Sequence, residues 1–291
     1  MNGNSDEILR SYLDRLTIEY RYLETTEATT ACTVFGKKLD TPIMLGGLAH
    51  YEKLNPGGGP LYAEAAKAAG TAIWTGFTFD SEIEEIAAVG APAARIIKPF
   101  ADKELVFKAI EHDTKLGCCA IAMDIDHAYT KAGRYDDFFE KPLASPTRAT
   151  LEEFGKYSEL PFFAKGVLSV KDAEICAEAG IAGIVVSQHQ NMFPWNVPTL
   201  KVLPEIRKAV GNSLTILCDS CLDTGYECFK ALALGADAVF TVRPMMPIFR
   251  EKGAEGVAER LSQMTDELRS CLSRTGSPDI RQIDPGVIHF I

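Results

Sequence analysis

Eight short apolar runs alternate with amphipathic segments along this chain of 291 residues, and this repeat limits the possible folds more than any other feature. Polar and apolar residues do not alternate within the runs, which indicates strands buried on both faces, as in parallel sheets. A polar loop and a segment with helical spacing follow each run, and successive runs begin 28 residues apart on average. The runs are Pro42–Leu48, Thr71–Gly76, Ala94–Ile97, Cys119–Met123, Phe162–Ala164, Ile181–Val186, Leu214–Cys218 and Ala238–Thr241.

Eight strand–helix units favour an α/β fold of the (β/α)8 type, the TIM barrel. The rival is an open doubly wound sheet with a glycine-rich dinucleotide turn, but the loop NPGGGP at 55–60 has the wrong glycine spacing for that turn. We predict one barrel over residues 41–291, which includes a helix at Glu255–Arg274. An extension over residues 1–40 precedes it, with a helix at Asp6–Glu24 and a hairpin, and we expect this extension to be a lid.

Charge and composition exclude several classes of partner. The formal net charge is -10, which disfavours a nucleic-acid surface or an anionic membrane patch. No apolar run approaches the roughly 20 residues that span a bilayer, and the first residues, MNGNSDEILR, lack the regions of a signal peptide. We expect a cytoplasmic protein with a small-molecule substrate.

The eight cysteines fit a reducing compartment, because several lie inside apolar runs. Cys218 and Cys221 form a C-x-x-C pair, but no second ligand pair at matching spacing accompanies them. We interpret the cysteines as small buried hydrophobic residues and predict no metal site.

Polar side chains lie where the predicted strands end, which is the edge of a barrel that carries its active site. Any one of them could be a solvated loop residue or half of an ion pair, but seven at corresponding places on six strands favour a functional ring. Lysine, histidine and carboxylates together suit general acid–base chemistry with stabilisation of an anion. The ring consists of Lys98, Asp124, Asp126, Lys165, His189, Asp219 and Arg243.

Two long segments carry a resemblance to a known family. PFFAKGVLSVKDAEICAEAGIAGIVVSQHQ and DSCLDTGYECFKALALGADAVFTVRP resemble the FMN-dependent α-hydroxy-acid oxidases and dehydrogenases, which include glycolate and lactate oxidases. The match continues through TPIMLGGLA, RIIKPF and AIAMDID and covers nearly the whole chain after residue 30. RIIKPF and AIAMDID resemble compact bacterial members of the family.

The resemblance implies roles for three catalytic residues. Lys165 matches a lysine that contacts the pyrimidine edge of the flavin. His189 matches the histidine that takes the hydroxyl proton of the substrate while the α-hydrogen leaves as a hydride to flavin N5. Asp126 matches the aspartate that pairs with this histidine. The cofactor-binding residues implied in the same way are Lys165, Lys98, Gly76, Asp124, Asp219, Ser220 and Arg243.

The chain departs from the family pattern at the phosphate loop. The family's Asp-Gly-Gly-Ile/Val-Arg-x-Gly reads DSCLDTG here, so that Ser220 and Cys221 replace glycines and Asp223 replaces the phosphate-binding arginine. Loss of one charge-assisted hydrogen bond costs roughly 1.5–3 kcal/mol, and added repulsion brings the loss of affinity to about a hundredfold. The substrate-carboxylate arginine of the family is replaced by Met192.

Two functions remain open from the sequence. The first is an FMN-dependent oxidoreductase that takes a hydride from a small 2-hydroxy acid or a related substrate, with His189 as base and Arg134, Met192 and Trp195 in contact with the substrate. The alternative is a divergent member that has lost or weakened FMN binding and acts as a flavin-free lyase or isomerase, or as a binding protein, through the same ring. By analogy with the family we expect a homo-oligomer, namely a tetramer.

Overall fold

The structure is a computed structural model that describes residues 3–189 and 192–291. Eight parallel strands form a closed barrel in the order β10-β11-β12-β13-β4-β5-β6-β7. Each predicted run overlaps one of these strands, so the predicted (β/α)8 barrel is confirmed. The strands are β4 (Ile43–Leu48), β5 (Ile73–Thr75), β6 (Ala93–Ile97), β7 (Ala120–Asp124), β10 (Phe162–Val167), β11 (Gly183–Val186), β12 (Thr215–Cys218) and β13 (Ala238–Thr241).

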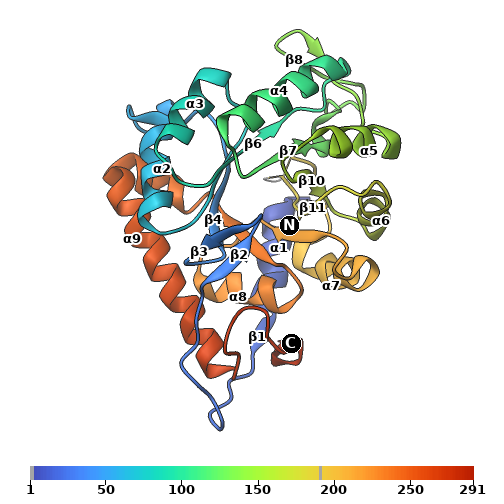
Figure 1. Cartoon of the computed structure of the whole chain (residues 1–291). Coiled ribbons are helices and arrows are strands. Elements are labelled where there is room, and N and C mark those ends of the chain that lie inside the picture. Colours follow the sequence, from blue (N-terminus) through green and yellow to red (C-terminus); the bar gives the residue numbers. More distant parts are fainter. Residues whose placement is uncertain (1–2, 190–191) are drawn as a thin grey trace.

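Eight helices surround the barrel and cover its outer face (Figure 1). They are α2 (Gly58–Ala68), α3 (Asp80–Ala88), α4 (Lys103–Leu116), α5 (Arg148–Tyr157), α6 (Val170–Glu178), α7 (Thr199–Val210), α8 (Gly225–Ala233) and α9 (Met245–Arg274). The last begins ten residues before the predicted helix. Gly253 lies inside it with φ 61° and ψ -150°, so α9 is two helical segments joined at a kink.

A layer of closely packed aromatic side chains fills the interior of the barrel. The indole ring of Trp74 lies 5.4 Å from the ring of Phe163 and 5.3 Å from that of Phe240, between ring centroids. Gly46 makes room for this layer, because a Cβ there would lie 2.5 Å from the Phe240 ring. Since side chains alternate along a strand, the residue two positions after an interior residue also faces inward, at the carboxyl edge. The aromatic layer is therefore the floor of any site at that edge.

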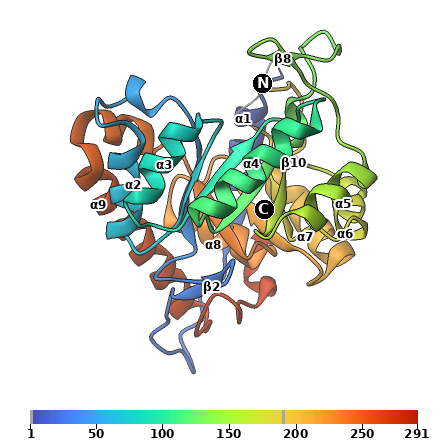
Figure 2. The ribbon, with the colours of Figure 1, turned by 45° about the horizontal axis from the view of Figure 1, so that its top comes forward.

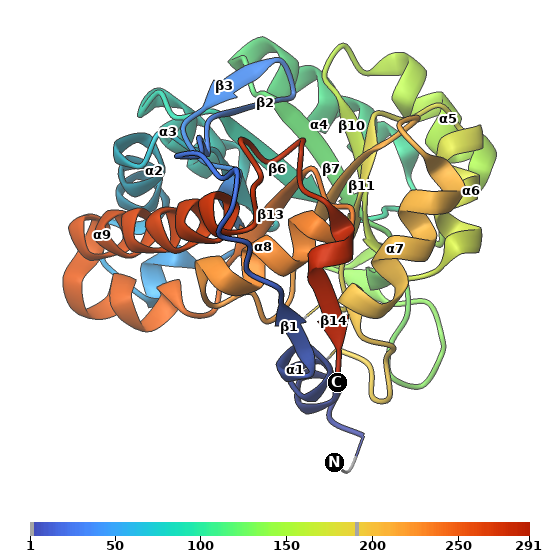
Figure 3. The ribbon, with the colours of Figure 1, turned by 90° about the horizontal axis from the view of Figure 1, so that it is seen from below.

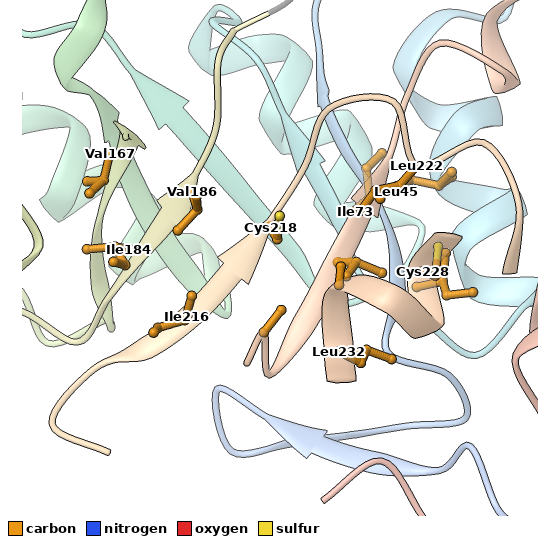
Figure 4. Close-up of a cluster of buried hydrophobic side chains, with 14 of the residues drawn as sticks. Leu45, Ile73, Val167, Ile184, Val186, Ile216, Cys218, Leu222, Cys228 and Leu232 are labelled. Atoms are coloured by element: carbon orange, nitrogen blue, oxygen red, sulfur yellow. The ribbon is translucent and has the colours of Figure 1, made fainter. Parts of the chain in front are cut away.

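The opposite faces of the strands pack against the helices (Figure 4). Cys228 and Leu232 of α8 lie among the outward side chains of the neighbouring strands, and Leu222 from the loop after β12 lies beside them. Leu222 is 2% exposed, so this loop is anchored to the core. Burial raises the pKa of the Cys218 and Cys228 thiols, as the interpretation of cysteines as buried hydrophobic residues requires.

The N-terminal residues form a helix and two strand pairs. The first helix, α1, covers Ser5–Asp14 and is ten residues shorter at its end than predicted. Thr17 and Ile18 lie instead in β1 (Leu16–Ile18), which pairs antiparallel with β14 (Ile288–Phe290) next to α1 (Figure 3). β-branched residues favour an extended partner strand over a helix.

The predicted hairpin exists but lies at the end of the barrel opposite the site (Figure 2). It consists of β2 (Cys32–Val34) and β3 (Lys37–Leu39). Phe35 at its turn contacts Trp74 and Phe163 from the amino ends of the strands. The hairpin is therefore a plug rather than a lid over the site.

Short elements complete the chain, and β8 with β9 forms a second hairpin at the carboxyl edge of the barrel (Figure 2). Among the residues described, no helix is both long and apolar enough to span a bilayer. The short elements are η1 (Tyr51–Lys53), η2 (Ile125–His127), β8 (Asp137–Phe138), β9 (Lys141–Pro142) and η3 (Pro285–Val287).

Candidate active site

Two lysines and one aspartate meet at the carboxyl edge of neighbouring strands. Lys98 follows β6, Asp124 ends β7 and Lys165 lies in β10, and each is at most 5% exposed. Lys98 Nζ donates to Asp124 Oδ2 over 2.7 Å, and Lys165 Nζ lies 3.2 Å from Asp124 Oδ1. Burial alone would raise the pKa of Asp124, but Lys165 and Lys98 outweigh it and hold this pKa well below its usual range. Asp124 is therefore a carboxylate clamped between two ammonium groups.

The charge state of Lys165 is set by its acidic neighbours. Burial would lower its pKa, but Asp124 and, to a smaller extent, Asp219 and Asp126 raise it above the usual value. The side chain is a permanent cation at neutral pH. It can stabilise an anion, but it cannot act as a free amine nucleophile.

His189 lies beside this cluster and is oriented by Asp126. Its Nδ1 lies 3.2 Å from Asp126 Oδ1 and 3.1 Å from Oδ2. A carboxylate only accepts hydrogen bonds, so Nδ1 donates to Asp126, and in the neutral imidazole Nε2 is the nitrogen with the lone pair. Lys165 Nζ lies 3.4 Å from the same Nδ1. The structure thus brings together the three residues predicted to be catalytic.

Gly166 leaves the space that the Asp126 side chain occupies. Gly166 has φ +100°, and a Cβ there would lie 2.3 Å from Asp126 Cγ. The pairing of β10 with β11 shifts its register between Lys165 and Val167. Lys165 faces inward two residues after the interior Phe163, and the space above Gly166 is left to the aspartate, which lies in η2 after β7.

His127 is a second histidine at the site, and the sequence analysis assigned it no role. Its ring centroid lies 4.5 Å from that of His189. Burial first, and then the charge of Lys98, lower its pKa to about 4. It is therefore neutral at pH 7. Its position just past the fourth strand of the barrel is the sequence signal from which it could have been predicted as a site residue.

Two connected cavities open at this edge. One, of about 220 Å³, is lined by the charged cluster, His127, His189 and the glycines Gly47 and Gly76. Phe77 and Phe138 cover it, with ring centroids 4.4 Å apart. The other, of about 40 Å³, leads toward Asp219 and Arg243 and shares with the first the residues Gly47, Lys165 and His189.

A wider crevice of about 650 Å³ lies on the other side of Asp126, between the loops after β7 and β11. Met192 and Lys131 line it, so Met192 lies where a substrate could reach Asp126. Trp195 is 70% exposed and lies beside Gly3 instead. Arg134 is exposed on the loop after β7, where its carbonyl accepts from Thr130. Substrate contacts by these two residues stay predictions.

The loop after β12 keeps a glycine-like backbone without glycines. Ser220 has φ 78° and Cys221 has φ 55°, both in the left-handed region that favours glycine. Ser220 Oγ donates to Asp219 Oδ1 over 2.7 Å. Arg243 donates to both carboxylate oxygens of Asp6 in α1, over 2.6 and 3.0 Å. Two of the predicted phosphate-binding side chains are thus engaged with protein carboxylates.

The start of α8, which follows this loop, is also engaged. The amides of Asp223 and Thr224 donate to Glu227 Oε2 over 2.7 and 2.9 Å. The amide of Gly225 donates to Glu267 Oε2 over 2.6 Å. Arg10 of α1 pairs with Asp223 over 2.6 Å and also with Glu227. Carboxylates of the protein therefore fill the positions where a helix N-terminus could receive a phosphate.

Comparison with known proteins decides the family. The family model described as FMN-dependent dehydrogenase matches residues 3–137 and 130–290. The chain belongs to the FMN-dependent dehydrogenase family. It is 28% identical to glycolate oxidase 3 of Arabidopsis thaliana, over 94% of this chain and 84% of the relative. It is also 28% identical to 4-hydroxymandelate oxidase of Amycolatopsis orientalis, over 93% of this chain and 86% of that one.

Solved structures agree with this membership. A crystal structure of mandelate oxidase superposes with a TM-score of 0.90 at 26% identity and covers 100% of this chain and 91% of its own. A mandelate oxidase variant with a monooxide FMN adduct gives a TM-score of 0.89 at 27% identity, with coverage of 100% and 92%. The resemblance inferred from the sequence is therefore confirmed.

Three side chains that could serve as metal ligands also occur at the site. Oxygens of Asp124 and Asp126 and a nitrogen of His189 lie within 4.8 Å of one another. Asp124 is already neutralised by Lys98 and Lys165, and two cations at this distance oppose a metal ion. The absence of a resident metal stays a prediction.

Proposed function

We propose that this family member oxidises a 2-hydroxy acid to the corresponding 2-oxo acid, with FMN as its cofactor and His189 as the base. The observation that carries the proposal is the geometry of His189, which Asp126 holds through Nδ1 beside the buried ammonium of Lys165. Both side chains line the cavity of about 220 Å³. The family and the relatives named above support the reaction class.

The residues around this cavity fit the ring system of a flavin. Gly47 and Gly76 line the cavity without side chains, and the only atom within 4 Å of a Cβ on Gly47 would be Lys165 Cε, at 3.8 Å. Lys98 and Lys165 supply two buried cations beside it. Such a donor set suits the polar edge of a heteroaromatic ring that gains negative charge. Lys98, Lys165, Gly76 and Asp124 would hold the ring.

The reaction divides between the cofactor and these side chains. When bound, FMN supplies the acceptor for the two electrons that leave with the α-hydrogen. His189 Nε2 accepts the hydroxyl proton, and Asp126 stabilises the resulting imidazolium at Nδ1. Lys165 stabilises the negative charge that develops beside it. The substrate loses one proton and one hydride and leaves as a 2-oxo acid.

The charge of Lys165 argues against the flavin-free alternative. A Schiff base requires a neutral amine, but Asp124 keeps this lysine protonated. The family match likewise favours oxidation over lyase or isomerase chemistry.

Anaerobic reduction of the bound flavin tests the proposal. We expect a panel of 2-hydroxy acids to bleach the flavin absorbance of the wild-type protein. The variant His189→Asn should bind flavin but bleach at least about a hundredfold more slowly, because a general base contributes roughly 10²–10⁴-fold. His289→Asn, in the exposed strand β14, is the matched control. Bleaching of His189→Asn at the wild-type rate would refute the assignment of the base.

A cytoplasmic location and a homo-oligomeric state remain part of the proposal. The cysteines support the first, because all eight are free thiols. Resemblance to the family supports the second.

A further inference from the structure

The phosphate end of the cofactor site is closed by the protein itself. Arg243, which follows β13, is the guanidinium nearest the small cavity, and Asp6 of α1 binds it through two hydrogen bonds. A carboxylate that meets a guanidinium in this bidentate manner satisfies the same donors that a phosphate would use. Gln188 Nε2 donates to Asp6 Oδ1 over 3.1 Å and fixes the carboxylate in place.

The arginines beside the loop after β12 are also paired with carboxylates of the protein. Arg10 pairs with Asp223 and Glu227, and its Nη2 donates to the carbonyl of Cys221 over 2.8 Å. Arg260 donates to the carbonyl of Asp223 and pairs with Glu267. Every arginine around the loop therefore already has a carboxylate partner.

The balance of charge opposes a phosphate. Three guanidinium groups, the ammonium of Lys165 and five carboxylates surround the loop and its cavity, an excess of one negative charge. A dianion placed there meets repulsion from the carboxylates, and each of these four cations already has a carboxylate partner. The groups are Arg10, Arg243, Arg260, Lys165, Asp6, Asp219, Asp223, Glu227 and Glu267.

The volume of the cavity beside Arg243 also opposes the binding of a phosphate. The cavity beside Arg243 measures about 40 Å³ and has room for only a few water molecules. The ring end of the site is more than five times larger, at about 220 Å³. A phosphate ester there would have to displace the Asp6 carboxylate to use the donors of Arg243.

We propose that the Asp6 carboxylate is a built-in substitute for the phosphate of the cofactor, so that this protein recognises its flavin by the ring and not by the phosphate. The proposal rests on the proposed function, since it concerns the same flavin site. It makes Asp6 and Arg243 residues that determine cofactor specificity. Riboflavin, which lacks the phosphate, should therefore bind nearly as well as FMN.

Flavin titration of the stripped full-length protein tests the proposal through quenching of flavin fluorescence. We expect the dissociation constants for FMN and riboflavin to agree within about threefold. In Asp6→Asn, which frees the Arg243 charge, FMN should bind about tenfold or more tightly while riboflavin is unchanged. Glu7→Gln is the matched control, because it removes the same charge from the same helix turn without touching Arg243.

Two results would overturn the proposal. One is wild-type binding of FMN more than about thirtyfold tighter than riboflavin, and the other is weaker FMN binding in Asp6→Asn. If neither flavin binds, the proposed function fails, and inorganic phosphate then decides the present proposal. Phosphate should not raise the melting temperature of the wild type above that in chloride of equal ionic strength, and a rise of several degrees would show an open anion site.

Discussion

Replacement of Asp124 by asparagine removes the carboxylate from the charged cluster at the carboxyl edge of the barrel. The side chain keeps its shape, but Lys98 and Lys165 lose their common counter-ion at 2.7 and 3.2 Å. Both ammonium groups are then buried, 5% and 4% exposed, with no carboxylate at hydrogen-bond distance. We expect the variant to be strongly destabilised.

The size of the effect follows from the two ways in which the protein can respond. Leaving a buried charge uncompensated costs about 3–5 kcal/mol. Deprotonating one lysine at pH 7 instead costs about 4.6 kcal/mol, from a pKa of about 10.4 and about 1.36 kcal/mol per unit. The protein adopts the response that costs less free energy, so Asp124→Asn should lower the free energy of unfolding by about 3–5 kcal/mol.

Urea denaturation measures this change, and Asp126→Asn is the matched control two residues away. Asp126 contacts His189 but is not clamped between the lysines, so its variant should lose less than about 1 kcal/mol while flavin bleaching slows. Asp124→Asn within about 1 kcal/mol of the wild type would refute the reasoning, because the cluster would then not be held by buried charge.

Two further variants test the surroundings of His189. Gly166→Ala should lower the free energy of unfolding by more than about 2 kcal/mol and remove most of the activity, because the added Cβ displaces Asp126. Gly117→Ala is the control, since φ is +79° there and no atom lies within 4 Å of the added Cβ. Denaturation of this control should show only the backbone cost of about 1 kcal/mol. The pKa of His127 is about 4 in the folded protein and 6.5 ordinarily, so the unfolded state binds more protons and stability falls as pH drops from 6.5 to 4. His127→Asn should reduce that fall by about 1–2 kcal/mol in melts across this range, and an unchanged pH dependence would contradict the assignment.

The strands were predictable because their sequence pattern has a direct physical cause. A strand of a closed parallel barrel is buried on both faces, so it appears as an uninterrupted apolar run, such as Pro42–Leu48. The polar residue after each run then has to lie at the carboxyl edge. This reasoning places Lys98, Asp124, Lys165 and His189 together from the sequence alone.

The position of the N-terminal segments was not predictable in the same way. The helical spacing near residue 6 continues to Tyr20, yet α1 ends at Asp14 because Thr17 and Ile18 find a partner strand in β14. A pairing across the whole chain leaves no local signal. The pairing of Asp6 with Arg243, a contact between residues 237 positions apart, is hidden for the same reason.

The pairing of β1 with β14 also has a consequence for synthesis. Leu16 cannot pair with Phe290 until that residue has been synthesised. At roughly 5–20 residues per second, the ribosome needs roughly 15–55 s to make the intervening chain. Until then the strand that anchors the end of α1 has no partner. The salt bridges that α1 brings to the cofactor site are therefore among the last contacts that a newly made molecule can complete.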